Sequence, residues 1–90
     1  MPPPITLPPE KLAILRPLVL KYVYSNGTGP DLSVPVAKME QDLGLEREEM
    51  RAVHMAILVE GLVAERARSG HIGLSQKGKF EAQDLLNEDR

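Results

Sequence analysis

Apolar side chains recur at helical spacing in the first third of the chain, which predicts a helix from about Pro9 to Ser25. Proline suits the first turn of a helix, and Ser25-Asn26-Gly27 is a plausible end. Pro17 lies inside this stretch and removes one backbone donor, so we expect a kink or a break there. The main apolar stripe consists of Leu12, Leu15, Val19, Tyr22 and Val23.

This first helix is apolar on more than one face, because Ile14, Leu18 and Leu20 lie outside the main stripe. A helix that is apolar nearly all round is expected to be buried on several sides. A second subunit would supply the cover, which predicts a homodimer; crowded packing inside one chain is the alternative. The expected dimer contacts are Leu12, Leu15, Leu18, Val19 and Tyr22.

The middle of the chain predicts a short strand and two further helices. Leu32-Ser33-Val34 favours a strand, and Pro35 opens a second helix over Val36 to Leu43, closed by Gly44 in the left-handed region. The third helix is expected from about Glu46 to Glu60, because its early glutamates suit the positive helix end. Met55, Leu58 and Val59 leave this helix with few polar positions on its outer side.

The last third predicts a two-stranded ribbon followed by a helix. Leu62 to Arg68 and His71 to Leu74 flank Ser69-Gly70, read as a two-residue turn that sets Arg66 opposite Gly73. Ser75 is the expected N-cap of a helix from Gln76 to about Asn87. In this register Val63, Glu65, Ala67, Ile72 and Leu74 share the core face, and Arg66, Arg68 and His71 share the other.

Three short strings mark the joints between these elements. They are Leu43-Gly44-Leu45, Glu60-Gly61-Leu62-Val63, and Leu74-Ser75-Gln76-Lys77-Gly78. Together with the element order, they make the chain resemble the winged-helix (winged helix-turn-helix) domains of bacterial and archaeal regulators. The resemblance covers residues 9–88 and implies one mostly helical α+β domain, preceded by a flexible Pro-rich arm at residues 1–8.

The resemblance also implies where nucleic acid would bind. In this family the third helix commonly enters the major groove, and the wing touches the backbone or the minor groove. Carried over, the DNA-binding residues would be Arg47 and Arg51 on the third helix, Arg66, Arg68 and His71 on the wing, and Lys77 and Lys79 just beyond it. The alternatives are a solvated helix start with Arg51 paired to Glu48, a charged but idle hairpin, and ordinary surface lysines.

The distribution of charge along the chain supports two different functions. The formal net charge is −2, and Glu46, Glu48 and Glu49 surround Arg47, whereas residues 66–79 contain no acid. The acid-free stretch favours a homodimeric regulator of transcription that binds double-stranded DNA. The acidic third helix and its apolar flank favour the rival, a winged-helix module that binds another protein.

Composition narrows the remaining classes. Ninety residues suit one domain, and the absence of cysteine excludes a disulfide scaffold. The first residues lack a basic segment followed by an apolar run, and no apolar stretch reaches the roughly 20 residues of a membrane span. We therefore expect a cytoplasmic protein without a membrane partner.

No constellation of catalytic residues is visible, so we expect no enzyme activity. The loop at residues 26–30 lacks the Gly-Lys-Ser/Thr ending of a phosphate loop, and we expect no cofactor. His54 and His71 have no metal-ligand spacing, so no metal site is predicted. We expect His54 to be a partly buried, hydrogen-bonded structural residue.

Overall fold

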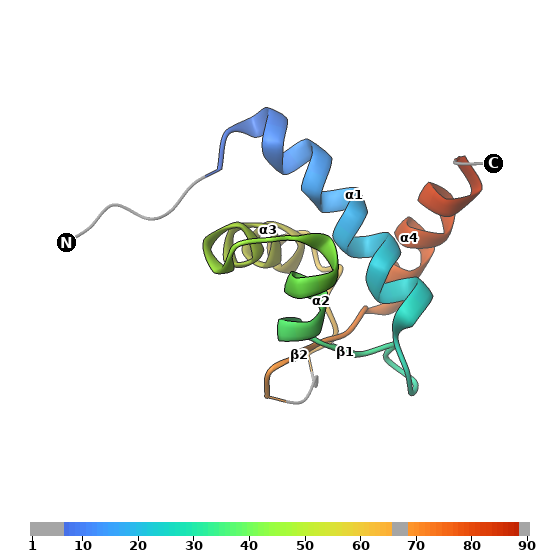
Figure 1. Ribbon diagram of the computed structural model, residues 1–90. Helices are drawn as coiled ribbons and strands as arrows, with labels where there is room; N and C mark the ends of the chain where they lie inside the picture. The colour runs from blue at the N-terminus through green and yellow to red at the C-terminus, as the bar shows by residue number, and fades with distance from the viewer. Residues whose placement is uncertain (1–6, 66–68, 89–90) are drawn as a thin grey trace.

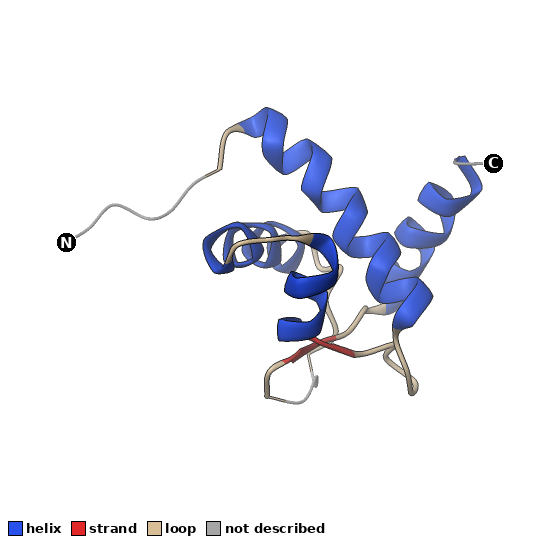
Figure 2. Ribbon diagram, in the orientation of Figure 1, coloured by secondary structure: helices blue, strands red, loops and turns tan. Residues whose placement is uncertain are grey.

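The computed structural model describes residues 7–65 and 69–88 of the chain. Within these residues the element order is α1 (Pro9–Asn26), β1 (Val34–Pro35), α2 (Val36–Leu43), α3 (Arg47–Val59), β2 (His71–Ile72) and α4 (Gln76–Glu88) (Figure 1). Figure 2 shows that helices dominate and that the two strands form one small ribbon. The predicted class, α+β and mostly α, is confirmed. No helix in this described part of the chain has the length and apolar character needed to cross a membrane.

Of the predicted kink or break at Pro17, the break does not occur, because helix α1 is continuous from Pro9 to Asn26. Leu15 on one side of Pro17, and Val19, Leu20 and Val23 on the other, are all buried in the same core. These side chains anchor residues on both sides of Pro17 in the core, and α1 contacts both α3 and α4. Tertiary packing therefore outweighs the one backbone hydrogen bond that the proline removes.

The ends of α2 and α3 follow the sequence closely. Gly44 ends α2 with φ 68°, in the left-handed region that glycine adopts without a steric penalty. Helix α3 begins directly after Glu46, whose backbone N–H donates to the Glu49 side chain at 2.9 Å. The predicted bounds of both helices agree with the structure to within a residue.

The ribbon differs from the prediction in its pairing. Strand β2 pairs antiparallel with β1, with Val34 opposite Ile72 and Pro35 opposite His71. The other wing strand was expected at Leu62 to Arg68; of these residues the structure describes 62–65, and they contribute one isolated bridge, Val63 opposite Leu74.

The register predicted for the hairpin is wrong by two residues. Ala64, and not Arg66, lies beside Gly73, whose carbonyl accepts the Ala64 N–H at 2.9 Å. Glu65 is already in a turn and exposed, because a carboxylate is costly to bury without a partner. A shift of two preserves the face of every side chain, so Val63, Ile72 and Leu74 are buried together as predicted.

One apolar core draws on all four helices and both strands of the described residues. Its members are Leu15, Val19, Leu20, Val23, Val34, Met39, Met50, Val53, Ile57, Leu62, Val63, Ile72, Leu74 and Ala82. This membership corrects the predicted dimer surface, because Leu15 and Val19 are used inside the chain. Leu12 and Tyr22 pack against the same core, and the Tyr22 hydroxyl donates to Asp42 at 2.5 Å. Leu18 alone of the predicted dimer contacts is exposed, at 39%.

The start of α4 packs tightly against the segment that leaves α3. Ser75 Oγ accepts the Gly78 N–H at 3.1 Å and donates to the Gly61 carbonyl at 2.6 Å, which confirms the predicted N-cap. A Cβ at Gly78 would lie 2.1 Å from the Leu62 carbonyl oxygen. The glycine is therefore required by this close approach.

Charged side chains link α1 to α4 and to the C-terminal end of α3. Arg16 of α1 donates to both carboxylate oxygens of Glu60 and to Glu81 of α4, each at 2.8 Å. The hydrogen bonds from Arg16 lower the pKa of the Glu60 carboxyl. We call this group of three side chains the Arg16 clasp.

Candidate functional site

The candidate site is a shallow concavity along α3. Arg47, Arg51 and His54 are four and three residues apart, so they share one face of the helix. Helix α2 and the turn at Gly70 form the other wall, and the volume is about 450 Å³. The Gly70 carbonyl accepts the Val36 N–H at 2.9 Å, which fixes the turn against the start of α2. We call this site the α3 concavity; its lining is Val36, Ala37, Glu40, Arg47, Met50, Arg51, His54 and Gly70.

Most basic side chains in the described residues have a partner within the chain. The bonded ones are Lys11 with Glu49, Arg16 with Glu60 and Glu81, Lys38 with Asp42, Lys77 and Lys79 with backbone carbonyls, and Lys21, which also has a partner. Among the lysine and arginine side chains of residues 7–65 and 69–88, only those of Arg47 and Arg51 have neither a hydrogen bond nor an ion pair. Both are exposed. The alternative in which Arg51 pairs with Glu48 is therefore wrong.

Of the three glutamates that surround Arg47 in the sequence, Glu49 is buried, whereas Glu46 and Glu48 are exposed. Glu49 turns inward, where Lys11 binds its carboxylate at 2.5 Å and the Glu46 N–H donates to it. The hydrogen bond from Lys11 lowers the pKa of Glu49. Glu48 remains exposed on α3, and Glu40 lines the α3 concavity. Two arginines thus face one acid across this concavity.

His54 lies on the wall of the α3 concavity between α2 and α3. The ring is half-buried, as predicted, and burial lowers its pKa. The predicted hydrogen bond is absent among the described residues, and no buried side-chain nitrogen or oxygen there lacks a partner. The imidazole nitrogens therefore reach solvent through the concavity.

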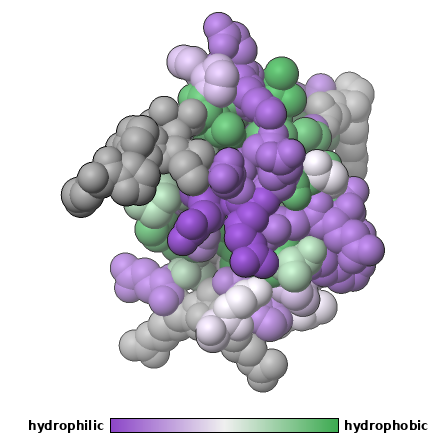
Figure 3. Space-filling view, turned by 60° about the vertical axis from the view of Figure 1, so that its left-hand side comes forward, coloured by the Kyte–Doolittle hydropathy of each residue, from purple (hydrophilic) through white to green (hydrophobic). Residues whose placement is uncertain are grey.

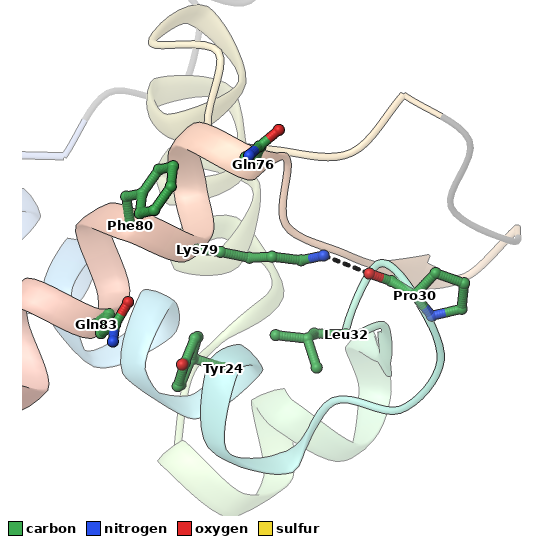
Figure 4. A pocket seen from close by; sticks show the side chains of 7 residues that line it. All are labelled: Tyr24, Pro30, Leu32, Gln76, Lys79, Phe80 and Gln83. Atoms are coloured by element: carbon green, nitrogen blue, oxygen red, sulfur yellow. Dashed lines mark hydrogen bonds between the residues drawn. The ribbon is translucent and has the colours of Figure 1, made fainter.

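The two candidate lysines lie far from the arginines. Lys77 Nζ donates to the Glu60 carbonyl at 3.1 Å, at the C-terminal end of α3, about 20 Å along the helix from Arg47. Lys79 Nζ donates to the Pro30 carbonyl, and Figure 4 shows its side chain extended from α4 to that loop. The structure thus separates Lys77 and Lys79 from Arg47 and Arg51.

Lys79 crosses a second concavity of about 420 Å³, between α1, α4 and the loop before β1. Two of the three aromatic side chains of the protein, Tyr24 and Phe80, line it (Figure 4). The Lys79 ammonium is bonded to Pro30 rather than directed outward. This arrangement anchors the loop to α4.

Of the three candidate DNA-binding residues in the ribbon, His71 alone lies within the described residues. His71 faces the loop at residues 28–35, and its Nδ1 lies 3.3 Å from the Ser69 carbonyl oxygen. Arg66 and Arg68 lie outside the described residues. In the sequence they precede Ser69-Gly70, and Gly70 lines the α3 concavity.

The C-terminal half of α3 is apolar where the N-terminal half is charged. Met55, Leu58 and Val59 are 59%, 47% and 82% exposed. Figure 3, which brings the left-hand side of Figure 1 forward, shows a central band of hydrophilic residues bordered by hydrophobic ones. The exposed surface of α3 therefore offers both cationic and apolar contacts.

The α3 concavity has the chemistry of an anion site. Two guanidinium groups without partners present planar arrays of donors, and a half-buried imidazole lies beside them. The described residues contain no cluster of side chains suited to hold a metal ion.

The structure brings both predicted arginines together with His54, for which the sequence predicted a structural role alone. The helical spacing to Arg47 and Arg51 was the available signal. Glu40 and Gly70 line the concavity because α2 and the turn at Gly70 pack against α3. No local sequence pattern predicts this packing.

Comparison with known proteins gives no relative, because no family model, curated protein or solved structure matches the chain.

Proposed function

We propose that the chain is a winged-helix protein that binds double-stranded DNA through α3 and regulates transcription. The observation that carries this proposal is the pair Arg47 and Arg51, exposed on one face of α3 without an internal partner. Every other lysine and arginine side chain of the described residues has a partner within the chain. Exposed guanidinium groups that make no hydrogen bond or ion pair within the described fold are available to an external anion.

The shape of α3 suits the major groove. That groove is about 12 Å wide and admits an α-helix, and arginine can bond to phosphates or to the O6 and N7 atoms of guanine. Because Arg47 and Arg51 lie in the first half of α3, the N-terminal end of the helix would approach the duplex. The inward turn of Glu49 removes one of the three carboxylates that would repel phosphates there.

The wing supplies the second part of the proposal. Arg66 and Arg68 stand in an acid-free sequence beside Gly70, which lines the same concavity as Arg47 and Arg51. In the proposed complex these two arginines contact the backbone or the minor groove next to the groove that α3 enters.

A second candidate function has its own observation. Met55, Leu58 and Val59 expose apolar surface on α3, and Glu48 lies exposed on the same helix. Phosphates disfavour both features, whereas a partner protein could cover them. The second candidate is thus a winged-helix module that docks α3 onto another protein.

The test is binding to a mixed-sequence duplex over a series of salt concentrations. Wild type should bind more weakly as salt rises, and Arg47→Ala/Arg51→Ala should reduce the slope of log K against log salt by about 1.8, or 0.9 per lost phosphate contact. Lys21→Ala, which removes one charge from α1, should leave the slope unchanged.

Two results would overturn the DNA proposal. One is the absence of duplex binding at low salt. The other is a slope that the double variant and wild type share. With either result, the apolar half of α3 becomes the surface to test against protein partners.

Dimerisation remains a prediction, restricted by the core. On the outer side of α1, Ile14 and Leu18 are 63% and 39% exposed, whereas Leu15 and Val19 are buried. A dimer through α1 would use the first pair. Sedimentation equilibrium at high micromolar concentration tests this, since a monomer there would remove the prediction.

A further inference from the structure

We propose that His54 belongs to the anion-binding group of the α3 concavity and takes up a proton when a DNA phosphate binds there, so that duplex binding strengthens as pH falls. The inference rests on the proposed function and adds to it a named contact and a pH dependence. It gives His54 a binding role in place of the structural one that the sequence predicts.

The geometry places His54 where a phosphate held by the arginines would be close. His54 is three residues after Arg51 and seven after Arg47, so the three side chains follow one helical stripe into one concavity. None of the three has a hydrogen-bond partner among the described residues. An anion bound between the guanidinium groups would therefore meet an imidazole that is free to donate.

The charges around His54 come from two elements. Helix α3 contributes Arg47 and Arg51, and α2 contributes the carboxylate of Glu40. The described residues of the turn, Ser69 and Gly70, carry no ionisable side chain. Without an anion, the two positive charges outnumber the single negative one.

The direction of the effect follows from linkage. In the free protein, burial lowers the pKa of His54 and so favours the neutral ring. An anion within about 4–6 Å favours the charged imidazolium, which raises the pKa in the complex above its value in the free protein. Binding then takes up a proton, and affinity rises as pH falls by at most about tenfold per pH unit.

The chain offers a matched control, because it contains two histidines. His71 lines a different concavity, with residues of the loop before β1. His54→Gln and His71→Gln each remove one imidazole and leave an amide, so they differ in position alone. Glu40→Gln separates the effect of the neighbouring carboxylate.

The experiment measures duplex affinity at constant salt from about pH 5.5 to about pH 8, where phosphodiesters keep their charge. Wild type, His71→Gln and Glu40→Gln should tighten about three- to tenfold per pH unit over the lower part of this range. His54→Gln should show no such gain. A gain that His54→Gln retains, or that His71→Gln loses, would overturn the proposal.

An NMR titration of the two imidazole rings gives a second readout. With duplex bound, the pKa of His54 should rise relative to the free protein, and that of His71 should change less. Salt-dependent duplex binding with an unchanged His54 titration would overturn this inference and leave the proposed function standing. Failure to bind duplex at any pH would overturn both.

Discussion

Arginine side chains have opposite environments in the Arg16 clasp and in the α3 concavity. Arg16 donates three hydrogen bonds to two carboxylates and joins α1, α3 and α4. Arg47 and Arg51 lie exposed on α3 and bond to nothing in the described residues. The comparison teaches that the number of charges says little about function here. The useful signal is which charges the fold leaves without a partner.

Apolar side chains show the same division. Near the Arg16 clasp, Ala82 and Leu62 are buried, and Gly78 permits a backbone contact closer than any side chain would. Along the outer side of α3, Met55 and Val59 remain exposed. The side chains near the Arg16 clasp therefore stabilise the fold, and the exposed face of α3 is available to a partner.

The largest expected effect is on the clasp end. Gly78→Ala would force a Cβ against the Leu62 carbonyl and should lower the free energy of unfolding by about 3 kcal/mol. Gly44→Ala is the matched control, because open space surrounds it and only its positive φ is strained, at about 1 kcal/mol. Urea unfolding measures both; equal losses would show that α4 is not packed this tightly.

The next effect concerns the α3 concavity and separates binding from stability. Arg51→Ala should weaken duplex binding by about 1–3 kcal/mol while the free energy of unfolding stays within about 0.5 kcal/mol of wild type. The reason is that Arg51 has no partner to lose within the described fold. Fluorescence anisotropy and urea unfolding check the two halves, and a clear loss of stability would refute the division.

Arg16→Met should do the reverse, lowering the free energy of unfolding by about 1 kcal/mol and leaving the salt slope of binding unchanged. The folded pKa of Glu60 is depressed by Arg16, so this stability is present above the unfolded pKa of a glutamate, about 4.3. It is lost as pH falls through the folded pKa. Unfolding measured against pH should show wild type and variant converging in acid; a constant difference would assign the loss to packing.

The smallest effect is expected at Val59. Because this side chain is 82% exposed, Val59→Ser should change the free energy of unfolding by no more than about 0.5 kcal/mol. Duplex affinity should also stay close to that of wild type. If Val59→Ser instead binds duplex markedly more tightly than wild type and no longer binds a protein that wild type binds, the second candidate function is favoured.

Much of the fold was predictable because its signals are local. Pro35, Gly44 and Ser75 mark helix ends by their own chemistry, and all three act as expected. The hairpin register was not predictable, because the exposure of Glu65 and the pairing of Val63 with Leu74 depend on the surrounding packing. The use of Leu15 and Val19 inside the chain likewise depends on where α3 and α4 lie.

The candidate site was predictable in part for the same reason. Helical spacing places Arg47 and Arg51 together, and the structure keeps them exposed. Spacing could not show that Lys77 and Lys79 are bonded to carbonyls of distant segments. It also could not show that α2 and the turn at Gly70 enclose His54 with the arginines.

The most direct test of the central claim is an amide NMR titration of the ¹⁵N-labelled protein with a short duplex. We expect shifts concentrated in the first half of α3, at residues 47–54, and in the turn at residues 69–70. The amides around Arg16, Glu60 and Glu81 should hardly change. Shifts centred on the Arg16 clasp, or no shifts at low salt, would contradict the proposal that Arg47 and Arg51, which have no partner in the described residues, bind DNA.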